Sequence, residues 1–235
     1  MIIKRLFGRS FDQIRPFKIV KKFTSNSDAS ILISMGNTVV LCNANILDSV
    51  PDFMKGTNSP WITAEYSMLP SSTKVRMTRE AVVGKQSGRT HEIQRLIGRS
   101  LRAAFDMKYS GEFTIKVDCD VLQADGGTRC ASITGAYLAI VDILPVLYKK
   151  YSIRYDKKFE KIAAISVGLI NNDILLDMDY KEDSNCDVDM NVVMDANGNF
   201  IEIQVTGEKI KFNKEKFDLM LSAAGHGILK LISYY

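Results

Sequence analysis

The spacing of apolar side chains changes along this chain, and each spacing predicts a different element. Between residues 112 and 122 the apolar side chains fall on one face, and Thr114, Lys116, Asp118 and Asp120 fall on the other. An alternation with a period of two is typical of a strand with one buried face. The stretch 135–148 stays apolar over several helical turns instead, which predicts a buried helix.

The same two periods extend over the rest of the chain. Alternation predicts a hairpin over residues 29–46, a strand near 61–67, and further hairpins over 162–180 and 187–206. Helical spacing predicts helices over 91–106, from about 131 onward and over 214–232, the last with Asn213 as its N-cap. Groups of strands that alternate with helices indicate a mixed α+β fold. Since no linker or low-complexity segment interrupts the sequence, we predict one domain over residues 1–235.

A glycine-rich turn joins the strand at 112–122 to the apolar helix that follows it. The sequence there is Gly126-Gly127-Thr128-Arg129. Such a turn leaves free backbone N–H groups at the positive end of the helix dipole, where phosphate or another anion binds. Thr128 adds a hydroxyl and Arg129 a planar cationic group. A tight strand–helix turn in which Arg129 pairs with a carboxylate explains the same residues, and the turn alone does not separate the two interpretations.

Two other segments carry chemistry that a phosphate site uses. Residues 84–96 form a second glycine-rich, basic stretch that runs into a helix, with Arg89 just before the first turn. Residues 182–189 contain four acidic side chains, among them Asp183 and Asp189. Carboxylates beside a phosphate site bind a hard cation such as Mg²⁺, or supply a proton to a leaving oxygen. A solvated acidic turn is the alternative interpretation of that cluster.

These segments resemble, in their order along the chain, the ribonuclease PH family. Further matching stretches lie at 8–16, 53–56, 61–70, 131–136 and 189–194, so that the resemblance covers residues from about 8 to about 230. It implies a β-β-β-α-β-α layered domain of the ribonuclease PH type, a two-layer fold similar to that of a ribosomal protein. Two departures stand out: Ser71 replaces an arginine of many relatives, and the altered segment 205–208 leaves Thr206 and Glu208 doubtful as site residues.

The resemblance implies a phosphate-dependent exoribonuclease, also described as a transfer RNA nucleotidyltransferase. Such enzymes trim the 3′ tails of transfer RNA precursors, with inorganic phosphate as co-substrate, and release nucleoside 5′-diphosphates. The matching phosphate-binding residues are Arg89, Gly127, Thr128 and Arg129. Asp183 and Asp189 match the two acidic catalytic residues, and the resemblance implies that they hold Mg²⁺. Within this pair, we expect Asp189 to bind the metal and Asp183 to assist proton delivery.

Positive charge is unevenly distributed along the chain. The formal net charge is only +4, but residues 4–22 and 74–102 are strongly basic, which is the electrostatic pattern expected for RNA binding. Arg76 and Arg79 lie in a predicted loop and match family arginines that contact RNA, and Lys74 of the same loop is expected to contribute where Ser71 replaces an arginine. Arg95, Arg99 and Arg102 share one helix face, which is more typical of a solvated surface or a subunit contact.

The resemblance also implies a hexamer built as a trimer of dimers, which the residue pattern itself does not show. No apolar run reaches the ~20 residues of a membrane span, so no membrane association is expected. The four cysteines lack metal-ligand spacing, which favours reduced core residues and a cytoplasmic protein.

Two other function classes fit parts of the sequence. One is a catalytically silent, RNA-binding ring subunit of an exosome-like assembly, although such subunits commonly lose the phosphate arginine or the acidic pair. The other is a small-molecule kinase on a similar fold, which requires a nucleotide-binding loop that Gly126-Gly127-Thr128-Arg129 replaces poorly. Arg89, Arg129, Asp183 and Asp189 are all present, which favours the active exoribonuclease.

Overall fold

The computed structural model describes residues 5–108, 110–151 and 159–235. Its strands are β1 (Phe17–Lys21), β2 (Ala29–Met35), β3 (Thr38–Leu47), β4 (Trp61–Met68), β5 (Thr114–Gln123), β6 (Ile162–Ile170), β7 (Asp173–Leu176), β8 (Val188–Asp195) and β9 (Phe200–Gly207). Its α-helices are α1 (Glu80–Val83), α2 (Gly88–Ala104), α3 (Thr128–Lys150), α4 (Tyr180–Asp183) and α5 (Lys214–Ile232).

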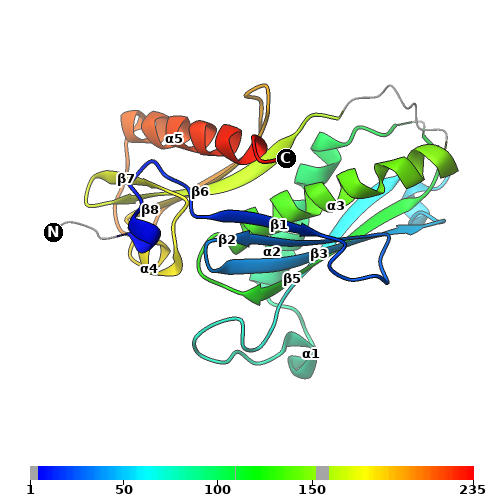
Figure 1. The fold of residues 1–235 in the computed structure, drawn as a ribbon, viewed down its shortest axis with the longest axis horizontal. Coiled ribbons are helices and arrows are strands. Elements are labelled where there is room, and N and C mark those ends of the chain that lie inside the picture. The colour runs from blue at the N-terminus through cyan, green and yellow to red at the C-terminus, as the bar shows by residue number, and fades with distance from the viewer. Residues whose placement is uncertain (1–4, 109, 152–158) are drawn as a thin grey trace.

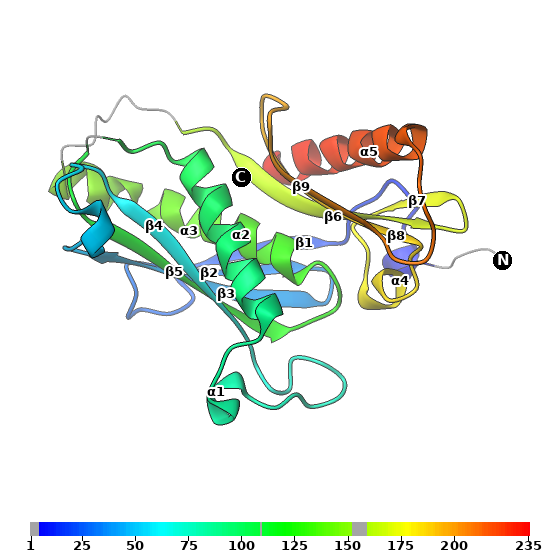
Figure 2. The same ribbon diagram turned by 180° about the vertical axis from the view of Figure 1, so that it is seen from behind.

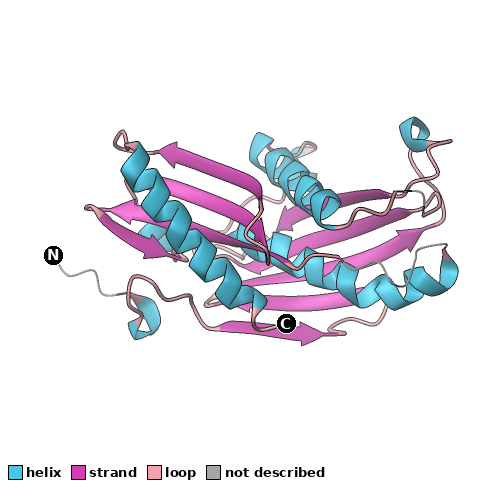
Figure 3. Ribbon diagram, turned by 90° about the horizontal axis from the view of Figure 1, so that it is seen from above, coloured by secondary structure: helices cyan, strands magenta, loops and turns pink. Residues whose placement is uncertain are grey.

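The strands form two sheets that lie end to end (Figure 1). The first has the order β1-β2-β3-β5-β4, in which β4 runs parallel to β5 and the other neighbours are antiparallel. The second has the order β7-β6-β8-β9 and is antiparallel throughout. Figure 3 shows helices covering one face of each sheet. The predicted mixed α+β fold is therefore confirmed, while the prediction of one domain stays a prediction.

Helix α3 is the central element of the core. It packs on β2 and β3 of the first sheet and on β6 of the second, and α2 lies beside it over β4 (Figure 2). By length and hydropathy α3 resembles a membrane span, but 72% of its most apolar window is buried inside the protein. Burial by both sheets accounts for its apolar sequence, which is typical of a core helix. One cluster of buried side chains runs through both sheets.

Several element boundaries differ from the predicted ones. Helix α3 begins at Thr128, not near residue 131, so that Thr128 and Arg129 form its first turn. Helix α2 begins at Gly88, because the Ser87 hydroxyl accepts a hydrogen bond from the Thr90 N–H and caps the helix early. Arg89 therefore lies inside the first turn and not before it. Strand β1 and helix α4 were not predicted.

Three arginines of the basic N-terminal segment are buried, so they are not available to bind RNA. Arg5, Arg9 and Arg15 are all buried, each within reach of a buried carboxylate. Arg5 Nε lies 2.7 Å from Glu182 Oε1, and Arg15 Nη2 lies 2.6 Å from Asp177 Oδ1. These arginines hold the N-terminal segment against the second sheet, so their charge is neutralised inside the protein.

Gly135 marks the closest approach of α3 to the first sheet. A Cβ at this position would lie 2.6 Å from Cys42 Sγ and 2.8 Å from Ile33 Cγ2. Gly135→Ala is therefore expected to lower the free energy of unfolding by roughly 1–3 kcal/mol through overpacking. Gly225 of α5 is the matched control, since a Cβ there meets only Met194 at 3.9 Å. Gly225→Ala is expected to raise stability by up to about 1 kcal/mol, and urea unfolding of both variants measures the difference. Equal effects of the two changes would contradict the close packing.

Candidate functional site

A cavity of about 800 Å³ opens where the two sheets meet. The first turn of α3, helix α4 and strand β8 contribute to its wall, together with the start of α2 and the loop 73–77. The predicted residues that line it are Lys74, Arg89, Gly127, Thr128, Arg129, Asp183 and Asp189. Segments that are distant in sequence thus bring the predicted phosphate-binding and acidic residues to one place.

The turn before α3 requires glycine at two consecutive positions. Gly126 and Gly127 have φ values of 77° and 64°, in the left-handed region that disfavours other residues. A Cβ on Gly126 would also lie 2.6 Å from the carbonyl oxygen of Met178. The Thr38 hydroxyl donates to the Gly126 carbonyl over 2.6 Å and accepts from the Asp125 N–H over 2.9 Å. The turn is therefore fixed by Thr38 of β3 and lies closely against the segment that follows β7.

The N-terminus of α3 is available to an anion. Gly127 holds the N-cap position and no side chain caps the helix, so the first-turn N–H groups keep their capacity to bind an acceptor. The hydroxyl of Tyr66 donates to Thr128 Oγ1 over 3.0 Å, which fixes the Thr128 side chain at the cavity wall. These features match the anion site that the Gly-Gly-Thr-Arg sequence predicted.

The two arginines differ in how firmly they are held. Arg129 Nη1 donates to Gln204 Oε1 over 2.8 Å and lies 3.5 Å from Glu92 Oε1. The pairing with a carboxylate that the sequence left open is thus present, although at the outer limit of an ion pair. Arg89 is exposed at the cavity. The cavity therefore has one guanidinium that is braced by β9 and one that is exposed.

The carboxyl groups of Asp183 and Asp189 sit in an environment that disfavours their charge. Burial, reinforced by the nearby Asp183, raises the pKa of Asp189 to about 6. Burial also raises the pKa of Asp183, although Arg89 and Arg129 act in the opposite direction. Asn191 Nδ2 donates to Asp189 Oδ2 over 2.9 Å and orients that carboxyl group. Burial is the main cause for both carboxyl groups, and a cation bound beside them would favour their charged forms.

Helix α4 owes its place to a capping box. The Asp179 side chain accepts from the Glu182 N–H over 2.9 Å, and the Glu182 side chain accepts from the Asp179 N–H over 3.0 Å. Arg5 Nε holds the outer side of Glu182, and the hydrogen bonds of Glu182 outweigh its burial and lower its pKa. Asp183 follows directly, so a buried ion pair behind the cavity wall determines where its carboxyl group lies.

The donor set of the cavity fits Mg²⁺. Asp183 and Asp189 offer hard oxygen ligands, and the acidic side chain of Glu208 lies nearby at the cavity lining. Among the residues that the structure describes, no group of three or more His, Cys, Asp and Glu is arranged to bind a metal by itself. Mg²⁺ typically uses one or two carboxylates and takes its other ligands from water and substrate phosphates. The site therefore suits an ion that is bound jointly with a phosphorylated substrate.

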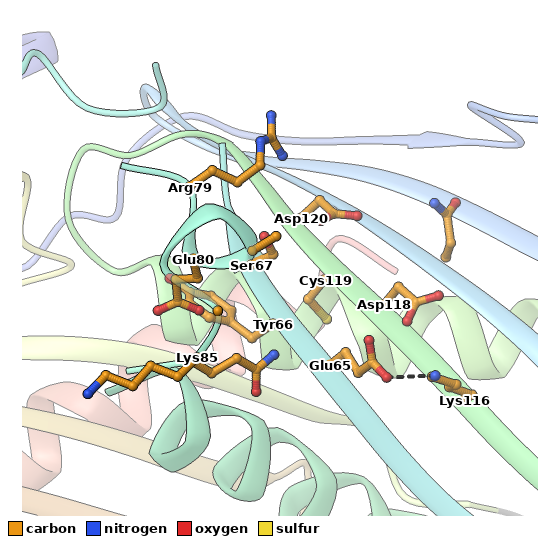
Figure 4. A pocket seen from close by; sticks show the side chains of 14 residues that line it. Glu65, Tyr66, Ser67, Arg79, Glu80, Lys85, Lys116, Asp118, Cys119 and Asp120 are labelled. Atoms are coloured by element: carbon orange, nitrogen blue, oxygen red, sulfur yellow. Dashed lines mark ion pairs between the residues drawn. The ribbon is translucent and has the colours of Figure 1, made fainter. Parts of the chain in front are cut away.

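The three predicted RNA-binding residues do not come together. Lys74 lines the cavity, whereas Arg79 lines a second cavity of about 750 Å³ on the open face of the first sheet. Arg76 is exposed and lines neither cavity. Figure 4 shows Arg79 in this second cavity together with Glu65, Asp118 and Asp120. The acidic side chains of this second cavity lie on the first sheet, on the face that carries Lys116. Lys116 Nζ forms an ion pair with Glu65 Oε1 over 2.6 Å.

Several cavity residues were not identified from the sequence. Asn191 lies two residues after Asp189 on the same strand face, and this alternation was a usable signal. Glu208, which the altered segment 205–208 left doubtful as a site residue, lines the cavity, whereas Thr206 does not. Gln204, which braces Arg129, lies 75 positions further along the chain and has no local signal. Tyr180 was overlooked because its acidic neighbours suggested a solvated turn.

Comparison with known proteins places this architecture. Residues 13–144 match domain 1 of the 3′ exoribonuclease family, and residues 161–226 match domain 2. Ribonuclease PH of Corynebacterium kroppenstedtii is 53% identical over 228 residues, which cover 97% of this chain and 90% of that protein.

Solved structures show the same fold at low sequence identity. An Archaeoglobus fulgidus exosome with RNA bound to the active site has a TM-score of 0.80 at 19% identity, and covers 98% of this chain and 92% of its own. Rice (Oryza sativa) Rrp46 has a TM-score of 0.77 at 17% identity, with 97% and 96% covered. The matches to both family domains and the 53% identical relative settle the relationship. The chain belongs to the 3′ exoribonuclease family.

Proposed function

We propose that the 800 Å³ cavity is the active site of a phosphorolytic 3′–5′ exoribonuclease. Its family membership makes the chain a phosphate-dependent exoribonuclease and nucleotidyltransferase. The observation that carries the location of the site is the convergence of an uncapped helix N-terminus, two arginines and two carboxylates with raised pKa values on one cavity. Inorganic phosphate attacks the terminal phosphodiester and releases a nucleoside 5′-diphosphate.

The residues of the cavity compensate the negative charge of the two reacting phosphate groups. The attacking phosphate and the scissile phosphate are both anions, so their charges must be compensated before they approach each other. The α3 N-terminus, Thr128 and the two arginines bind the nucleophile and orient it for in-line attack. Asp189, with Asp183 beside it, would hold Mg²⁺, and the ion would supply charge stabilisation to the scissile phosphate and the leaving 3′-oxygen. Asp183 in its protonated form is suited to deliver a proton to that oxygen, because burial raises its pKa.

The wider biological setting is part of the same proposal. The substrate is the 3′ tail of transfer RNA precursors, and the protein acts in the cytoplasm as a hexamer, a trimer of dimers. Lys74 at the cavity, with Arg76 and Arg79 on the neighbouring exposed loop, supplies positive charge for the RNA backbone. Exposed Val75, Val82 and Val83 of that loop region support a contact between subunits. A monomer with full activity on long substrates contradicts this part.

A silent RNA-binding ring subunit is the second candidate, favoured only by the likeness to exosome structures. Digestion of a labelled RNA with a short single-stranded 3′ tail separates the two. With Mg²⁺ present, an active enzyme shortens the RNA only when phosphate is added, and nucleoside diphosphates appear. Binding without shortening in either condition favours the silent subunit. Release of monophosphates without phosphate means that water is the nucleophile.

Arg129→Ala tests the role of the Gly-Gly-Thr-Arg turn. Loss of one preorganised donor to a charged reacting group is expected to lower the rate by roughly 10²-fold. We expect the KM for phosphate to rise as well, while the affinity for RNA changes little. Arg99→Ala is the control, since Arg99 also pairs with a β9 side chain, Glu202, but lines no part of the cavity. An unchanged phosphate KM in Arg129→Ala removes Arg129 from the phosphate site.

A further inference from the structure

The cavity is lined by one aromatic ring that has no role in the proposed binding of phosphate or metal. Tyr180 is the only aromatic residue among the described residues that line it. Tyr180 is 57% exposed and, within the described part of the chain, its side chain has no hydrogen bond, ion pair or ring contact. The ring is therefore not required by packing, and its exposed face is available to a ligand.

The backbone of Tyr180 is held firmly in spite of the exposed side chain. Its N–H donates to Asp125 Oδ1 over 3.3 Å, and its carbonyl accepts from the Ser184 N–H over 2.9 Å. The close approach of Gly126 brings the Gly-Gly-Thr-Arg turn against the same peptide, since a Cβ on Gly126 would lie 2.9 Å from the Tyr180 nitrogen. The backbone from which the ring projects is thus held against the Gly-Gly-Thr-Arg turn.

The position of the ring relative to the acidic pair identifies its ligand. Tyr180 and Asp183 stand three residues apart on one helical turn, and side chains at this spacing lie on the same face. A nucleotide whose phosphate lies at Asp183 therefore has its base within reach of the ring. Met68, Val75 and Met77 add apolar surface to the same cavity. An aromatic ring with apolar neighbours favours the face of a base over its hydrogen-bonding edge.

We propose that Tyr180 stacks on the base of the 3′-terminal RNA nucleotide and holds the terminal phosphodiester at the acidic pair. Stacking accepts any base, because every base has a π-face, so this contact provides affinity without sequence preference. The inference rests on the proposed function, since it names the part of the RNA that the cavity binds. Tyr180 acts as a substrate-binding residue and moves no proton.

A double-mutant cycle between the protein and the RNA tests the contact. The enzyme and its Tyr180→Ala variant are compared on two RNAs that differ only in an ordinary or an abasic 3′-terminal nucleotide. Tyr180→Ala is expected to raise the KM for ordinary RNA by roughly tenfold, with the KM for phosphate unchanged. The wild type loses the same factor on the abasic RNA, and the variant loses nothing further. Tyr180→Phe keeps the wild-type values, and Tyr234→Ala, which removes a comparably exposed tyrosine outside the cavity, has no effect.

The outcomes separate failure of this contact from failure of the proposed function. An active wild type whose RNA KM is unaffected by Tyr180→Ala, or independent losses from the two changes, overturns the stacking contact alone. A wild type that does not shorten RNA overturns the proposed function. In that case equilibrium binding of the same two RNAs, followed by fluorescence anisotropy without phosphate, completes the cycle. Coupled losses in the dissociation constants still support the contact, and uncoupled losses overturn it.

Discussion

Asp189→Asn is expected to lower the rate of phosphate-dependent RNA shortening by roughly 10³-fold, because a metal ion contributes several kcal/mol of charge stabilisation in such reactions. Asparagine keeps the size of the side chain and the partnership with Asn191, but it removes the charge that binds Mg²⁺. The KM for RNA changes less than kcat, since Lys74 and the cavity wall are unaltered. Single-turnover rates at several Mg²⁺ concentrations measure the loss.

Asp183→Asn is the matched comparison for that result. Under the assignment of Asp189 to the metal and Asp183 to proton delivery, excess Mg²⁺ partly restores Asp189→Asn and does not restore Asp183→Asn. An RNA with a better leaving group at the terminal 3′-oxygen is expected to restore Asp183→Asn instead. Equal dependence of both variants on Mg²⁺ removes the basis for dividing the roles and leaves a shared metal site.

The raised pKa of Asp189 also predicts how activity and stability depend on pH. Below the folded-state pKa of about 6 the carboxyl group is protonated and binds no metal, so activity falls as the pH drops through this value. Mg²⁺ competes with the proton for the Asp189 carboxyl group, so a higher Mg²⁺ concentration is expected to shift this fall in activity to lower pH. Because the folded-state pKa exceeds the ordinary value, ionisation costs stability as the pH rises through 6. Asp189→Asn is therefore expected to melt at a higher temperature than the metal-free wild type at pH 8, which excludes misfolding as the cause of its inactivity.

The elements that the sequence predicted well are those with a regular period or a local cap. Strands β2, β3, β5 and β8 carry alternating side chains, and Asn213 caps α5 by accepting from the Lys216 N–H, as expected. The predicted start of α2 was too late, because the Ser87 cap lets the helix begin at Gly88, a residue that disfavours helix. Helix α4 was missed because one turn shows no period, although Asp179 and Glu182 have the spacing of a capping box.

The candidate site shows the same division between local and distant information. The glycine turn and the acidic segment were recognisable locally, and they lie on one cavity. The surroundings that tune them were not recognisable, because they come from distant segments. Arg5 meets Glu182 across 177 positions, and Arg129 meets Gln204 across 75. A basic N-terminal run therefore suggested RNA binding, whereas its arginines are buried partners of acids near the candidate site.

Asp177→Asn is expected to cost the largest share of stability of any substitution considered, about 3–5 kcal/mol. Arg15 and Asp177 are each 1% exposed, and they are joined by Nη2–Oδ1 and backbone N–Oδ2 contacts of 2.6 and 2.7 Å. The change leaves the guanidinium of Arg15 buried without the carboxylate that contacts it. Asparagine is the suitable replacement because residue 177 has a φ of 53°, which asparagine tolerates better than alanine.

The double variant Arg15→Met with Asp177→Asn separates the cost of the unpaired charge from the value of the pair. It is expected to recover most of the lost stability, since replacing a buried pair with apolar groups is often close to neutral. Asp218→Asn, which breaks the exposed pair with Lys214, is the control and costs less than about 0.5 kcal/mol. Urea unfolding at one protein concentration measures all three. A single variant as stable as the control would contradict the stability cost assigned to the unpaired charge of Arg15.

The double variant Arg15→Met with Asp177→Asn also tests whether this ion pair positions the phosphate-binding turn. Arg15 Nη1 donates to the Asp125 carbonyl over 2.6 Å, and Arg15 Nη2 would lie 2.9 Å from a Cβ on Gly127. The guanidinium therefore supports the glycine turn from behind while Asp177 holds the guanidinium. Once stability is restored without Arg15, this support is absent, so the KM for phosphate is expected to rise while the Mg²⁺ dependence stays unchanged. A stable double variant with wild-type phosphate kinetics would show that Thr38 alone positions the turn.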